Sequence, residues 1–91
     1  MMPTILVKKL DDSTYEVTVQ NGNSTTHIVT VLPHYAAKLV GGRTPVDRLV
    51  KLSFEFLLER ESNTSILRRF DLALIAHYFP EYEQTIRKML E

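Results

Sequence analysis

The sequence predicts a single α+β domain, in which a three-stranded antiparallel meander packs on a long central helix and short C-terminal helices complete the core. Three observations predict this class. Segments rich in Val, Ile and Thr fill residues 4–32, an amphipathic helical pattern covers residues 45–61, and shorter helical patterns follow over residues 62–91. Strands and helices that are segregated along a chain are typical of α+β proteins.

The composition fits one small domain and excludes several classes of function. The chain has 91 residues, of which 44% are hydrophobic and 24% charged, so it can bury one modest core. We divide it into a β-meander over 1–32, a short and a long helix over 33–61, and short helices over 62–91. Eleven basic residues balance eleven acidic ones, so no net charge attracts nucleic acid or an anionic membrane. The absence of cysteine excludes disulfides, thiol nucleophiles and cysteine-ligated metal sites.

The strands are predicted over Thr4–Leu10, Thr14–Gln20 and Thr25–Leu32. The middle strand alternates apolar and polar residues, as expected for an antiparallel strand with one buried face. The pair Asn21-Gly22 favours a two-residue hairpin turn, which would pair Tyr15 with Ile28. A longer loop would instead pair Val17 with Ile28, and the sequence leaves both registers open.

Two helices are predicted after the strands. Pro33 ends the sheet and begins a short helix that runs to Val40, where Gly41 supplies the left-handed residue that ends it. Thr44 is expected to cap the long helix over Pro45–Glu61. Apolar residues cover most of the circumference of this long helix, so it requires burial on more than one side.

Three shorter helical segments are predicted in the C-terminal third. We expect a helical turn over Ser65–Arg69, a short helix over Leu72–Tyr78 with Asp71 as its cap, and a last helix from Pro80 to Leu90. The last helix has acidic residues in its first turn and basic residues in its last turn, which complement the helix dipole.

Segments of the second half, about half of the chain in all, carry a resemblance to a family. These segments are Phe54–Glu61, Ser65–Leu72 and Tyr78–Glu83. They resemble a family of short prokaryotic proteins with no assigned function. Because that family has no known activity, the resemblance implies no site, substrate or partner.

The N-terminus and the hydropathy pattern favour a cytoplasmic location. No apolar run approaches the roughly 18 residues that a membrane span needs. The first residues lack the basic and apolar regions of a secretory signal. We therefore expect a cytoplasmic protein without a membrane partner.

The candidate catalytic side chains do not converge in sequence. The three histidines are His27, His34 and His77, and no two of them have the spacing of a metal site or of an acid–base pair on one helix. We therefore expect no catalytic residues, no cofactor and no metal. Ser53 lies in the middle of the long helix, where its hydroxyl is expected to bond back to the Leu49 carbonyl.

The absence of converging catalytic groups, together with the surplus apolar surface of the long helix, favours a non-enzymatic protein–protein interaction module. Its partner is expected to be another protein or a second copy of the chain, as a homodimer. The contact surface is expected at the sheet edge or on the aromatic C-terminal helices. The residues predicted to contact a partner are Ser53, Phe56, Tyr78, Phe79 and Tyr82.

Two other functions stay open from the sequence. The first is a nucleic-acid-binding regulator, antitoxin-like or transcriptional, and its contact residues would be Arg43, Arg48, Lys51, Arg68 and Arg69. The second is a small enzyme or anion binder at Gly41–Thr44, where backbone amides and an arginine precede a helix. The end of one helix followed by the cap of the next explains the same residues, so this second function is the least favoured.

Overall fold

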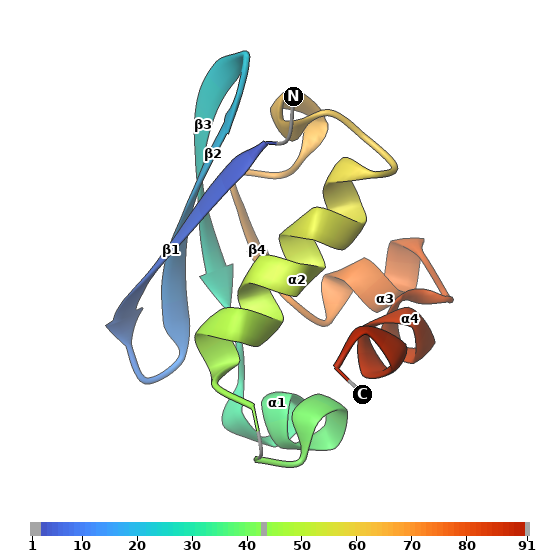
Figure 1. Cartoon of the computed structure of the whole chain (residues 1–91). Coiled ribbons are helices and arrows are strands. Elements are labelled where there is room, and N and C mark those ends of the chain that lie inside the picture. Colours follow the sequence, from blue (N-terminus) through green and yellow to red (C-terminus); the bar gives the residue numbers. More distant parts are fainter. Residues whose placement is uncertain (1–2, 43, 91) are drawn as a thin grey trace.

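A four-stranded sheet forms one layer of the molecule, and the helices form the other (Figure 1). The computed structural model describes residues 3–42 and 44–90. The elements are, in chain order, β1 (Thr4–Asp11), β2 (Thr14–Asn21), β3 (Asn23–Thr30), α1 (Pro33–Val40), α2 (Val46–Leu58), the 3₁₀ turn η1 (Asn63–Ser65), β4 (Arg69–Asp71), α3 (Leu74–Tyr78) and α4 (Tyr82–Met89). This arrangement confirms the α+β class.

The strands β1, β2 and β3 form an antiparallel meander, but neither of the predicted registers of β2 against β3 occurs. Tyr15 pairs with Val29, and Val17 pairs with His27. Both predicted registers differ from this one by a single residue, and each would turn Ile28 inward and His27 outward. The observed register buries Val29 instead, and the buried His27 finds hydrogen-bond partners inside the molecule.

The fourth strand, β4, has no counterpart in the sequence prediction, and the helical turn expected over residues 65–69 is wrong. The 3₁₀ turn η1 comes earlier, and residues 66–68, which are neither helix nor strand, lead into β4, which lies parallel to β3. The Ile28 N–H donates to the Arg68 carbonyl at 2.7 Å, and the Leu72 N–H donates to the Thr30 carbonyl at 2.9 Å. The sheet is therefore mixed, with its one parallel pair at the β4 edge.

Helix α1 begins and ends at the predicted residues. Pro33 occupies the first turn, where its missing N–H costs nothing. Gly41 ends the helix in the left-handed conformation, with φ of 62°, and its N–H donates to the Ala37 carbonyl at 2.8 Å. A residue with a side chain would be strained at this φ, which explains the glycine.

Helix α2 is shorter than predicted. It begins at Val46 rather than Pro45, and it ends at Leu58 rather than Glu61. The backbone of Pro45 is still extended, with ψ of 143°, so Pro45 itself takes the capping position. The predicted cap by Thr44 is therefore wrong, and the helix has no side-chain cap.

The C-terminal helices are also shorter than predicted. Helix α3 begins at Leu74, two residues later than expected, and α4 is shortened at both ends. The Asp71 carboxylate accepts a hydrogen bond from the Ala73 N–H at 3.0 Å, so it stabilises the turn that leads into α3. This is close to the predicted capping role.

Helix α2 lies between the sheet and the C-terminal helices, and its apolar surface is covered on both sides. On the sheet side, the Phe54 ring centre lies 5.4 Å from that of His27 and 6.0 Å from that of Phe70. On the other side, the Phe56 ring centre lies 5.3 Å from that of Tyr82. The chain therefore buries by itself the surplus apolar surface that the sequence pattern indicates.

The second face of the sheet is covered by none of the helices in the described part of the chain (Figure 1). Leu6 of β1 lies on this face and is 54% exposed, whereas its neighbours Ile5 and Val7 pack on the core side. Within residues 3–42 and 44–90, no helix is both long and apolar enough to cross a membrane.

Candidate functional site

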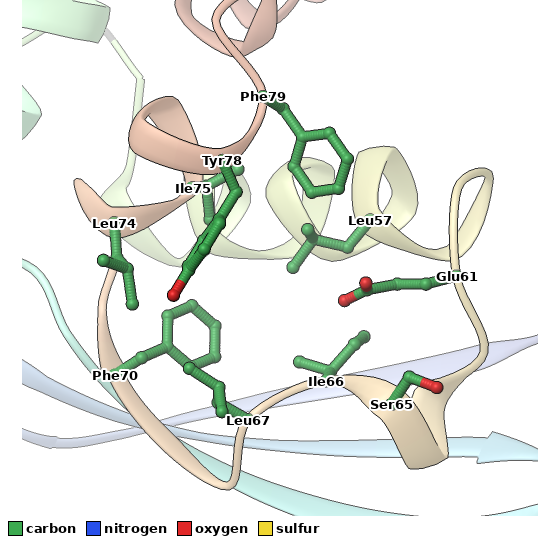
Figure 2. Close-up of a pocket in the computed structure, with 10 residues that line it drawn as sticks. All are labelled: Leu57, Glu61, Ser65, Ile66, Leu67, Phe70, Leu74, Ile75, Tyr78 and Phe79. Carbon is green, nitrogen blue, oxygen red and sulfur yellow. The ribbon is translucent and has the colours of Figure 1, made fainter.

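A groove of about 380 Å³ lies between the C-terminal part of α2, the segment 65–70 and α3 (Figure 2). Eight apolar or aromatic side chains and two polar ones line it. The residues of this groove are Leu57, Glu61, Ser65, Ile66, Leu67, Phe70, Leu74, Ile75, Tyr78 and Phe79. Its size and apolar lining are typical of binding pockets, which span about 300–1,000 Å³.

The groove has a buried floor and an exposed apolar rim. Ile66, Phe70 and Ile75 belong to the core and form part of the floor. Leu67 and Tyr78, which stand at the rim, are 52% and 63% exposed. Among the large apolar side chains in the described part of the chain, Tyr78 is the most exposed. Exposed apolar side chains beside a concave apolar floor are typical of a contact surface.

Pro80 explains why Tyr78 lies at the rim. A residue before proline avoids the helical conformation, and Phe79 has extended-type angles of φ −127° and ψ 89°. Helix α3 therefore ends at Tyr78. Phe79 turns back to the core, where its ring centre lies 5.9 Å from that of Phe56, and Tyr78 stays outside.

One carboxylate lies in the groove. Glu61 follows the end of α2, and its side chain points between Leu57 and Ile66 toward the centre of the groove (Figure 2). Among the residues that the structure describes, Glu61 makes no salt bridge, and its side chain has no hydrogen-bond partner. The groove therefore combines an apolar lining with one negative charge.

A buried polar cluster holds the Leu67 side of the groove against β3. The Nδ1–H of His27 donates to the Leu67 carbonyl at 2.8 Å, so Nε2 accepts from the Thr25 hydroxyl at 2.9 Å. The Asn63 side-chain amide donates to the Thr25 Oγ1 and to the Asn23 carbonyl, both at 3.0 Å. Burial lowers the pKa of His27 below its usual range, so the imidazole is neutral near pH 7. This role of Asn63 has no local sequence signal, because its partners lie 38 and 40 residues away along the chain.

The residues predicted to contact a partner divide into two groups. Tyr78 and Phe79 line the groove. Ser53, Phe56 and Tyr82 lie in the core, each at most 1% exposed, so they offer no surface to a partner of the folded chain. Only the tertiary packing separates the two groups.

Ser53 accommodates a side chain of its own chain rather than a partner helix. As predicted, its hydroxyl donates to the Leu49 carbonyl, at 2.7 Å. It also accepts from the Tyr82 hydroxyl at 2.6 Å, which satisfies the polar end of the buried Tyr82 ring. Burial raises the pKa of Tyr82, so this phenol remains a donor throughout the neutral range.

The structure separates the basic residues of the nucleic-acid hypothesis. Arg48 and Lys51 of α2 line a second groove, against β1. Arg68 and Arg69 lie at β4, the opposite edge of the sheet. Arg43 lies outside the described residues. The four described cations therefore form no continuous basic surface.

The remaining candidate sites contribute no convergent chemistry. Gly41 and Gly42 have left-handed φ values of 62° and 76°, as expected for the end of α1 and the following turn. His34 and His77 are exposed. In the described part of the chain, no three His, Cys, Asp or Glu side chains gather closely enough to hold a metal ion.

No protein-family model, no curated protein and no solved structure matches this chain. The resemblance to a family of short prokaryotic proteins therefore stays a prediction.

Proposed function

We propose that the protein is a non-enzymatic interaction module whose groove binds a short segment of another protein. The observation that carries this proposal is the pair of exposed side chains, Leu67 and Tyr78, beside a concave apolar floor. Burying apolar surface contributes about 25 cal/mol per Å². A partner that covers this rim and fills the floor removes apolar surface from water, and this burial favours binding.

The size of the groove favours a short segment over a folded partner or a second copy of the chain. Stable interfaces between folded proteins involve about 20–30 residues on each side. The groove is lined by ten residues. This surface matches the recognition of a few anchor side chains from an extended or helical peptide.

The test is a selection of random short peptides on the immobilised folded protein, followed by affinity measurements. We expect the selected peptides to lose about tenfold or more in affinity for Leu67→Ser and Tyr78→Ser, because each change removes apolar contact at the rim. Both side chains are more than half exposed, so the serine variants keep the core intact.

Leu6→Ser is the matched control, because Leu6 has nearly the same exposure as Leu67, 54% against 52%, on the distant open face of the sheet. It should bind the peptides as the unchanged protein does. The proposal is overturned if no peptide is selected, or if the Leu6 and Leu67 variants bind alike. A dimer in solution that dissociates in Leu67→Ser would assign the groove to a second copy instead.

A further inference from the structure

We infer that the segment bound in the groove carries a lysine or arginine close to its apolar anchor, and that this cation pairs with Glu61. The inference rests on the proposed function and names the chemistry of the partner. Three observations support it: one carboxylate points into the groove, the cation next to it in sequence is engaged elsewhere, and aromatic rings line the same groove.

The Glu61 carboxylate is half-buried within an apolar surface. Leu57 lies one helical turn earlier, and Ile66 lies across the groove (Figure 2). In the free chain this carboxylate still reaches water through the open side of the groove. An occupant that covers it removes that water, and a covered carboxylate without a partner costs free energy.

The cation next to Glu61 in sequence is engaged elsewhere. The Arg60 guanidinium lies 3.6 Å from the centre of the Phe56 ring and donates to the Phe56 carbonyl at 3.0 Å. It also pairs with Glu59 and Glu81, each at 3.6 Å. Arg60 is therefore engaged with Phe56 and with two other carboxylates, and within the described residues no salt bridge neutralises the negative charge of Glu61.

The aromatic side chains of the groove favour the same ligand chemistry. Phe70, Tyr78 and Phe79 contribute three rings to the lining, and aromatic faces attract ammonium and guanidinium groups. A carboxylate and aromatic rings within one apolar groove favour a segment in which a cationic side chain lies close to an apolar one. A purely apolar segment is disfavoured because it would cover Glu61 without compensation.

The experiment is the same peptide selection, with Glu61→Gln and Glu61→Lys as variants. We expect peptides selected on the unchanged protein to contain Lys or Arg near a large apolar residue. Glu61→Gln keeps the shape of the side chain and removes its charge. It should lower the affinity for these peptides about tenfold and abolish the salt dependence of binding. Peptides selected on Glu61→Lys should instead be enriched in Asp and Glu.

Glu55→Gln is the matched control. It makes the same chemical change at a glutamate of α2 that does not line the groove. It should leave affinity unchanged. The inference is overturned if Lys and Arg are not enriched, or if Glu61→Gln binds as tightly as the unchanged protein. If Leu67→Ser abolishes binding while Glu61→Gln does not, the inference alone fails. If neither Leu67→Ser nor Glu61→Gln weakens binding, the proposed function fails as well.

Discussion

A fully buried histidine joins β3 to the segment that forms one side of the groove. His27 is 0% exposed, and both ring nitrogens have hydrogen-bond partners, the Leu67 carbonyl and the Thr25 hydroxyl. Burial is the main cause of its lowered pKa. The hydrogen bond to Leu67 opposes the shift, and the charge of Arg68 adds to it. The neutral imidazole is therefore the form that the fold requires.

This pKa shift predicts a loss of stability in mild acid. In the unfolded chain His27 titrates near its usual pKa of about 6.5, whereas the folded chain binds the proton only at lower pH. The stabilising contribution is fully present above the unfolded pKa and falls as the pH drops toward the folded pKa. Urea unfolding between pH 7.5 and 5 should therefore show a declining free energy of unfolding. His27→Gln, which cannot titrate, should lose this part of the slope, and an equal slope in both proteins would contradict the prediction.

The elements of the fold differ in how far the sequence predicts them. Helix α1 is predicted to the residue because its two signals, Pro33 and Gly41, are local. Strand β4 is not predicted, because three residues carry no periodicity and its partner strand lies about 40 residues earlier. The register of β3 is also missed, since His27 looks like an outward-facing residue until its buried partners are known.

The residues of the groove are predicted only in part, because some of them are brought together by features that have no local sequence signal. Tyr78 and Phe79 are aromatic residues near a proline, which sequence reasoning selects as contact candidates. Leu67 lies in the groove because residues 66–68 are not helical, and Glu61 lies there because α2 ends early, at Leu58. Neither of these features has a local sequence signal, so neither residue could be assigned to a site in advance.

The attachment of η1 and β4 to β3 gives a prediction at the level of the element. Asn63 is 3% exposed and donates to the Asn23 carbonyl and the Thr25 hydroxyl. Asn63→Ala removes the bond to the Asn23 carbonyl and leaves the buried Thr25 hydroxyl without this donor, which should cost about 1–3 kcal/mol in urea unfolding. Hydrogen exchange of the Ile28 amide, which donates to Arg68, should accelerate because this bond joins β3 to the segment before β4.

Thr64→Ala is the control for this change, because Thr64 lies in the same turn and bonds only to an exposed serine hydroxyl, at 2.9 Å. It should alter the free energy of unfolding by less than about 0.5 kcal/mol. If the two alanine variants unfold alike, the side chain of Asn63 does not hold the segment to β3.

At the scale of the whole molecule, the distribution of apolar surface predicts a monomer in the absence of a partner. Both apolar sides of α2 are covered within one chain, by the sheet and by α4. The exposed edge strand β1 carries Lys8 and Lys9, and lysines on an edge strand oppose pairing with another sheet. The rim of the groove alone is smaller than a stable dimer interface requires.

Light scattering after size-exclusion chromatography should therefore give a mass near that of one chain, 10.5 kDa, at micromolar concentration. Addition of a selected groove-binding peptide should leave one chain per complex, because the peptide covers the groove and exposes no new apolar surface. A mass of two chains would contradict the prediction, and Leu6→Ser and Leu67→Ser would then locate the interface. If Leu6→Ser abolishes the dimer, the interface lies on the open face of the sheet. If Leu67→Ser abolishes it, the interface lies at the groove, and the peptide should compete with the second copy.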